Sequence, residues 1–255
     1  MPKVITVISQ SSEIGKTTTI INLASWISLL GKKALIIDLE PGGNASSIIG
    51  ALNGTRHIDL QEVILEQLPL DMAILNTPIK DLFIVPAFNK DTDPLFFDIF
   101  DENLFVLRDI IDLLETEFDY IFLDVPDLSV NIAKAALVAS DSVIIALKCE
   151  AAELDSIPPL IETIIEVKEN FNKWIELHGI LITLFSETSH SRQLIMRAKE
   201  KFGELMFKTV IPRNLKIAEA NNANCPVALY DMKSFGSESF LRLAREFMQY
   251  HEINV

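Results

Sequence analysis

The sequence lacks several features that mark membrane, metal-binding and secreted proteins. No uninterrupted apolar run approaches the ~20 residues that a membrane-spanning helix needs. The opening stretch MPKVITVIS leads directly into an expected strand, without the charged region, apolar segment and cleavage site of a secretory leader. Cys149 and Cys225 form no CxxC pair, which argues against a zinc knuckle or a disulfide framework and fits a reducing compartment. We therefore expect a cytoplasmic protein.

Positive charge is also scarce. The 255 residues contain 22 Lys and Arg against 36 Asp and Glu, for a net charge of −14. Because such a chain is repelled by nucleic acid and by anionic lipid as a whole, any contact with DNA must be local.

Short, continuously apolar runs alternate with longer helical patterns through most of the chain. Strands are expected at 4–9, 33–39, 81–87, 120–125, 142–147, 179–185 and 207–212, with a weaker one at 226–230; helices are expected at 16–30, 102–118, 152–171, 191–203 and 237–250. Strands without polar alternation are typical of a parallel sheet buried on both faces. The sequence predicts an α/β fold with a doubly wound, mostly parallel sheet and helices on both faces, forming one domain over residues 1–255. The least regular region, roughly 51–101, is expected to pack helices outside the sheet.

The end of the first expected strand carries the stretch SQSSEIGKTTT, residues 9–19. Gly15 permits close backbone approach, Lys16 can reach terminal phosphates and the Thr17 hydroxyl can bind magnesium, with the next helix offering its N-terminus. Gln10 occupies the first glycine of the full G-x-x-x-x-G-K-[ST] pattern, which is therefore not met. The alternative is an ordinary helix start with a solvated Lys16.

Three further polar groups follow apolar strands, where a parallel sheet forms its ligand crevice. Asp38 and Glu40 lie two positions apart and so on one side of an extended chain, which suits magnesium-bound water and an attacking water. Asp124 follows YIFL as a second acidic partner of the metal would. Lys148 follows SVIIAL. The alternatives are a helix-capping Asp38 and a solvated Lys148.

Together these motifs resemble the ParA/MinD family of deviant-Walker P-loop ATPases over almost the whole chain. The stretches DYIFLDVPD and VIPRN, the following AEA and a later YD resemble the partition branch, ParA/Soj. The resemblance implies a doubly wound fold, ATP and Mg²⁺ as cofactors, and an ATP-sandwich homodimer that binds nucleoid DNA nonspecifically. A cargo adaptor would stimulate hydrolysis and release the dimer.

The resemblance also assigns residues by position. Lys16, Asp38 and Glu40 would be catalytic, Glu40 replacing the family's aspartate, and Thr17, Asp38 and Asp124 would hold the metal. The expected ATP-binding residues are Ser11, Ser12, Glu13, Ile14, Gly15, Lys16, Thr17, Thr18, Lys148, Pro212 and Arg213, the last two near the base.

The loop departs from the family's K-G-G-x-G-K-T pattern. Ser11 replaces the signature lysine that reaches the other subunit's phosphates, and Ser12 and Glu13 replace two glycines. The lost interaction could be worth about 4 kcal/mol at contact distance in a partly buried site. Lys148 is the expected replacement. A serine at this position points to the McdA branch, which spaces carboxysomes with an McdB adaptor; the alternative is a plasmid or chromosome partition ATPase with a ParB-like adaptor.

Basic residues gather in the C-terminal third, which is the expected DNA-binding surface. The candidates are Arg192, Lys199, Lys201, Arg213, Lys216 and Lys233, with Arg192, Lys199 and Lys201 expected to share a helix face. Solvated helix charge is the alternative for each. Two other functions stay open: a MinD-like membrane ATPase, although the last helix lacks a cationic cluster, and a nucleotide-binding scaffold that no longer hydrolyses ATP.

Overall fold

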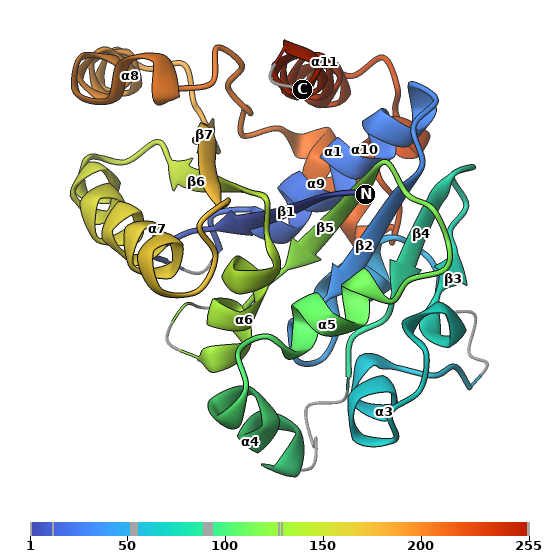
Figure 1. The fold of residues 1–255 in the computed structure, drawn as a ribbon. Coiled ribbons are helices and arrows are strands. Elements are labelled where there is room, and N and C mark those ends of the chain that lie inside the picture. The colour runs from blue at the N-terminus through green and yellow to red at the C-terminus, as the bar shows by residue number, and fades with distance from the viewer. Residues whose placement is uncertain are drawn as a thin grey trace.

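The computed structural model describes residues 2–11, 13–51, 56–88, 94–126, 128 and 130–253. Its centre is a seven-stranded sheet with the order β3-β4-β2-β5-β1-β6-β7 (Figure 1). Six strands are parallel: β1 (Lys3–Ile8), β2 (Ala34–Asp38), β4 (Leu82–Val85), β5 (Tyr120–Asp124), β6 (Ser142–Lys148) and β7 (Glu176–Thr183). Only β3 (Leu75–Asn76), at one edge, runs antiparallel to its neighbour. The predicted doubly wound α/β fold is confirmed.

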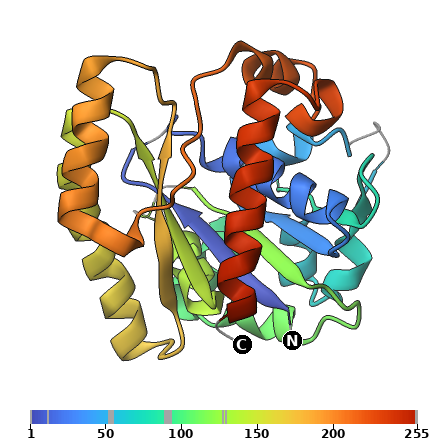
Figure 2. The same ribbon diagram turned by 90° about the horizontal axis from the view of Figure 1, so that it is seen from above.

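Helices cover both faces of this sheet (Figures 1 and 2). One face packs against α1 (Lys16–Leu29), α2 (Asn44–Ile48), α9 (Leu215–Asn222), α10 (Val227–Tyr230) and α11 (Phe235–Ile253). The other packs against α3 (Leu60–Leu65), α4 (Pro94–Glu102), α5 (Val106–Asp112), α6 (Asn131–Ala139) and α7 (Ile157–Asn170), with α8 (Ser189–Phe202) beside β7. The described residues also form three short 3₁₀ turns: η1 (Leu70–Ala73), η2 (Ala151–Ser156) and η3 (Gly203–Leu205).

The apolar strands form because both of their faces are buried. In β1, Val4 and Ile8 belong to the core under α3–α7, whereas Ile5 and Val7 belong to the core under α1 and α11. Alternate residues therefore serve opposite layers, as the pleat requires. The register places Asp38 of β2 directly beside Asp124 of β5, so the acidic ends of two strands meet at one edge of the sheet.

Several expected elements differ from the structure. Residues 207–212 run beside β7 but form only isolated bridges, Ile180 to Met206 and Phe185 to Pro212. Residues 227–230 form α10, not a strand. In place of the single helix expected at 102–118, Glu102 ends α4 and a separate helix, α5, covers Val106–Asp112. The following segment is held by Asp71, which accepts hydrogen bonds from the backbone amides of Glu115 and Thr116. Region 51–101 adds β3 and β4 to the sheet besides its helices.

Among the described residues, no helix has both the length and the apolar character needed to cross a membrane.

Candidate functional site

The loop between β1 and α1 has the backbone shape of a phosphate cradle. Gly15 caps α1 in the left-handed conformation, with φ of 91°, which glycine adopts without a steric penalty. Glu13 is also left-handed, with φ of 59°, an uncommon conformation for a residue with a side chain. The first turn of α1 contains no acidic residue, so its backbone N–H groups favour an anion.

Side chains from distant segments anchor this loop. The Thr183 hydroxyl, at the end of β7, donates a 2.7 Å hydrogen bond to the Ile14 carbonyl. The Ser9 hydroxyl donates to the carbonyl of Ser11 at 2.7 Å, and the Ser11 hydroxyl donates to Glu153 Oε1 at 3.1 Å. The Ser11 side chain thus bonds to a residue of the same chain. Ser12 lies outside the described residues.

The first turn of α1 meets the acidic strand ends. Thr17 Oγ1 lies 3.2 Å from Asp124 Oδ1 and 3.5 Å from Glu40 Oε2, as donor to both carboxylates. The structure therefore brings the sequence-predicted metal residue Thr17 together with Asp124 and Glu40.

Asp38 is fully buried and holds the segment that follows β2. Its Oδ2 accepts hydrogen bonds from Ser46 N at 2.9 Å and Ser46 Oγ at 2.7 Å, and its Oδ1 accepts from Glu40 N at 3.2 Å. Burial raises the pKa of Asp38 from 3.8 to about 6, the bonds from Ser46 and Glu40 offset part of this effect, and the charge of Glu40 adds to it. Asp38 thus positions Glu40.

Asp124 is fully buried at the end of β5. Burial and, after it, the charge of the neighbouring Asp38 raise the pKa of Asp124 well above its usual value, and the charge of Glu40 adds to this effect. The hydrogen bond from Thr17 and the charge of Lys16 lower the pKa of Asp124 and offset part of the rise. Its Oδ2 is buried without a hydrogen-bond partner. A divalent cation bound to this oxygen and to the Thr17 hydroxyl would satisfy the carboxylate.

The donor set fits magnesium bound together with a nucleotide. In the described part of the chain, no cluster of three or more His, Cys, Asp or Glu side chains is arranged to hold a metal by itself. Magnesium is usually held by one or two carboxylates, waters and phosphate oxygens, not by a complete protein cage. Thr17 and Asp124 provide such a partial set.

Two adjoining hollows lie at the loop and share Ile14, Gly15 and Thr18. The first, of about 510 Å³, is also lined by Glu13, Lys16, Thr17, Glu40, Pro41, Asn44, Ile48 and Pro126. The second, of about 250 Å³, includes Pro212 and Arg213 and the apolar side chains Leu184, Ile211, Ile217 and Phe240. The first suits phosphates and the second suits a planar base.

Besides several residues that line the hollows, sequence reasoning missed four residues that hold the site by hydrogen bonds. Ser46 binds Asp38, Thr183 and Glu153 anchor the loop, and Asn221 Nδ2 donates to Thr18 Oγ1 at 3.1 Å. Thr183 ends an apolar strand, a signal that could have found it. The others act from helices, whose sequence pattern carries no sign of the contact.

Lys148 ends β6 at the expected edge of the sheet. Its Nζ forms a 2.7 Å ion pair with Glu150 Oε1, and Lys148 is absent from the linings of both hollows. Any reach toward a nucleotide therefore requires Lys148 to leave Glu150.

The basic residues expected to contact DNA fall into two groups. Arg192, Lys199 and Lys201 lie on α8, where Arg192 pairs with Glu187. Residues two positions apart in a helix point about 200° apart. Lys199 and Lys201 therefore lie on different faces of α8, contrary to the expectation. Arg213, Lys216 and Lys233 surround α9 and α10, apart from α8 (Figures 1 and 2), and Lys216 pairs with Glu219 at 2.7 Å.

The fold and the site define a P-loop nucleotide hydrolase. Comparison with known proteins assigns the chain to a family within this class. A family model described as an AAA domain matches residues 2–177. The chain is 34% identical to the chromosome partitioning protein ParA of Myxococcus xanthus over 250 residues, 97% of this chain and 88% of that protein. It is 31% identical to the sporulation initiation inhibitor protein Soj of Bacillus subtilis over 252 residues, 96% of this chain and 98% of Soj.

Solved structures share the fold at lower identity. The septum site-determining protein MinD of Pyrococcus horikoshii, complexed with Mg-ADP, is 21% identical with a TM-score of 0.81 and covers 100% of this chain and 99% of that one. The McdA(D38A)-ATP complex of Cyanothece is 20% identical with a TM-score of 0.83, covering 97% and 96%. The chain belongs to the ParA/MinD/Soj family of P-loop ATPases and is ParA/Soj-like.

Proposed function

We propose that this chain is a partition ATPase that dimerises around Mg·ATP and holds nucleoid DNA until an adaptor stimulates hydrolysis. The supporting observation is the contact of Thr17 with Asp124 and Glu40 beside the phosphate cradle. It joins a metal-binding hydroxyl, a buried carboxylate with an orphaned oxygen and a half-buried carboxylate in one place.

Each residue has a distinct task in this proposal. The amides of the cradle and Lys16 bind the phosphates, and Thr17 with Asp124 holds the magnesium ion, which neutralises phosphate charge when bound. Asp38 fixes the segment after β2 through Ser46. Glu40 orients the attacking water and accepts its proton.

The first experiment measures ATPase activity of wild type, Lys16→Ala and Glu40→Gln, with the exposed Glu66→Gln as the matched control. Lys16→Ala should lose ATP binding, whereas Glu40→Gln should bind ATP and lower kcat by about 100-fold or more. Glu66→Gln should match wild type. A wild-type chain that binds ATP without turnover would instead support the non-hydrolysing scaffold.

We also propose that Lys148 replaces the signature lysine. Lys148 ends β6, the strand next to β1, and its ammonium group pairs with Glu150 at 2.7 Å. Lys148→Ala should weaken ATP-dependent dimerisation and hydrolysis, while Lys80→Ala, at a position 93% exposed, serves as the control. Normal dimerisation of Lys148→Ala, followed by light scattering, would refute this role.

DNA binding should depend on the nucleotide and on salt. The ATP-bound dimer should bind duplex DNA at low salt and the ADP-bound protein should not, because dimerisation doubles the basic patch. Replacing Arg192 and Lys199 with Glu tests α8, and the same change at Lys216 and Lys233 tests the second group. Equal binding in both nucleotide states would refute the proposal.

The adaptor that stimulates hydrolysis would identify the cargo that this chain positions. The partition relatives favour a plasmid or chromosome with a ParB-like adaptor. Ser11 favours the second candidate, a carboxysome with an McdB-like adaptor, since it removes the signature lysine. ATPase assays with each adaptor class separate the two, because only the matching adaptor should accelerate turnover.

Fluorescence microscopy of the tagged chain should show it in the cytoplasm on the nucleoid.

A further inference from the structure

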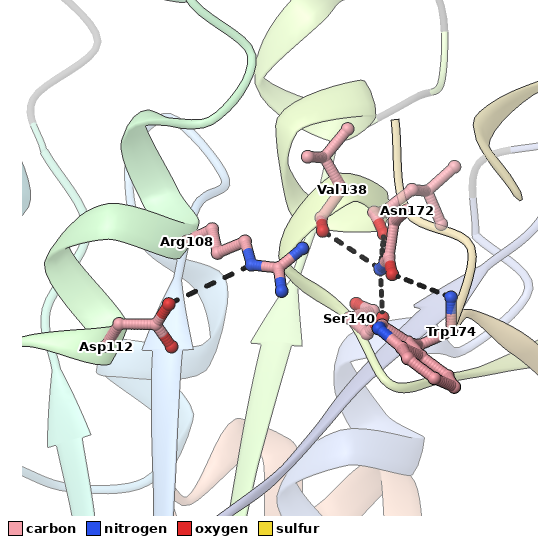
Figure 3. A network of polar contacts seen from close by, with 7 residues as sticks. Arg108, Asp112, Val138, Ser140, Asn172 and Trp174 are labelled. Atoms are coloured by element: carbon pink, nitrogen blue, oxygen red, sulfur yellow. Dashed lines mark hydrogen bonds and ion pairs between the residues drawn. The ribbon is translucent and has the colours of Figure 1, made fainter. Parts of the chain in front are cut away.

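The sheet edge opposite the phosphate cradle contains a second large pocket. It has a volume of about 540 Å³, within the usual range for small-molecule sites. Its walls come from the start of β1 and from the loops that follow α5, α6 and α7 (Figure 3). None of the residues assigned above to nucleotide, metal or DNA lines it.

Buried hydrogen bonds give this pocket a defined wall. Asn172 is only 4% exposed, and its Nδ2 donates to the carbonyls of Val138 at 3.0 Å and Ser140 at 2.6 Å. Its Oδ1 accepts a 3.1 Å bond from the backbone N–H of Trp174 (Figure 3). The loop is thereby held to the end of α6, while the Trp174 side chain remains 66% exposed.

The charges around the pocket favour a cation. Arg108 is the sole cationic side chain among the described residues that line it, and its Nε lies 3.8 Å from Asp112 Oδ2. The charges of Arg108 and Asp112 nearly cancel, so the net negative charge of the pocket lining comes from Glu117 and Asp141. Asp141 Oδ2 accepts a bond from Val4 N, whereas Glu117 is exposed.

The fold adds to this negative field. α6 ends at the pocket, and its last turn has no basic residue. The carbonyl end of a helix attracts cations, and Asn172 Nδ2 already occupies part of this end by donating to the carbonyls of Val138 and Ser140. This edge is thus the electrostatic opposite of the cradle, where the N-terminus of α1 attracts an anion. An anionic ligand would meet the carboxylates of Glu117 and Asp141 here.

Trp174 provides the remaining recognition element. An indole ring binds cations over its face more strongly than other aromatic rings. Lys173 Nζ already lies 4.7 Å from the ring centroid, but Lys173 lines a neighbouring hollow of about 380 Å³ and not this pocket. Trp174 lines both hollows.

We propose that this pocket binds a free aliphatic cation with a terminal ammonium or guanidinium group, with the charged end between Glu117, Asp141 and Trp174. The aliphatic portion packs against Val4, Leu114 and Phe118. This site is independent of the proposed partition function.

Tryptophan fluorescence provides a direct test. The chain has two tryptophans, and Trp26 is 7% exposed in α1, so Trp26→Phe leaves Trp174 as the reporter. Agmatine and spermidine, titrated at constant ionic strength, should change its emission saturably, while succinate should not. Calorimetry on the wild-type chain repeats the titration without any substitution.

Variants locate the site. Glu117→Gln should weaken binding about fivefold, the effect of losing one exposed charge contact, and Trp174→Ala should weaken it further in calorimetry. The exposed Glu200→Gln on α8 is the matched control and should bind as wild type. Absence of saturable binding, equal binding of succinate, or an unchanged affinity of Glu117→Gln would overturn the proposal. Binding of an arginine-containing tripeptide without binding of agmatine or spermidine would also overturn it.

Discussion

Replacing Asp124 with Asn should stabilise the nucleotide-free protein while removing its response to magnesium. Asp124 and Asp38 are both fully buried and are direct neighbours on β5 and β2. Adjacent strands lie about 4.8 Å apart, at which distance two full charges repel by about 3 kcal/mol at an effective dielectric constant of about 20. The Asn Oδ1 can still accept the bond from Thr17.

The raised pKa values of the two carboxyls determine how the stability of the folded chain changes with pH. The pKa of Asp38 is raised from 3.8 to about 6 in the folded chain, so this carboxyl lowers stability as pH rises through that window, and its full penalty is present above about pH 6. The pKa of Asp124 is also raised, by burial and by Asp38. Repulsion between the two carboxylates is therefore weak while Asp38 is protonated, below about pH 6, and grows as the pH rises and both carboxyls ionise.

Urea unfolding at both pH values tests this reasoning. Without magnesium and nucleotide, Asp124→Asn should be about 1–3 kcal/mol more stable than wild type at pH 8, with a smaller difference at pH 5. The exposed Asp98→Asn is the control. Adding Mg·ATP should stabilise wild type and not the variant. A less stable Asp124→Asn at pH 8, or an equal gain at pH 5, would refute the argument.

Three further substitutions test local structure by urea unfolding. Gly15→Ala should cost about 1–2 kcal/mol because φ is 91° with open space around the added Cβ, and ATP affinity should fall; unchanged stability would exclude the left-handed cap. Asn172→Ala should cost about 2–3 kcal/mol since it leaves the Trp174 amide and buried carbonyls unpaired; a loss below the experimental error would contradict this. Asp71→Ala removes bonds from Thr116 N at 3.0 Å and Oγ1 at 2.6 Å and should cost about 1–2 kcal/mol, whereas Thr116→Ser should keep them.

Local patterns were sufficient for most of the sheet. Continuously apolar runs identified the parallel strands because burial on both faces leaves a signal within a few residues. They failed at 207–212 and 226–230, where apolar content reflects packing of an extended segment and of α10. Periodicity reports burial and cannot by itself distinguish a strand from a short buried helix.

Local sequence patterns indicated the parallel strands β1, β2, β4, β5, β6 and β7, the presence of Gly15, Lys16 and Thr17 after the first strand, and the acidic ends of β2 and β5. These follow from local composition, since parallel strands place their ends at one edge. Packing of distant segments, in contrast, brings Ser11 to Glu153, 142 residues away, and Thr183 to the Ile14 carbonyl. It also left one oxygen of Asp124 without a partner. Such contacts depend on the distances between side chains that packing brings together, and no local pattern encodes those distances.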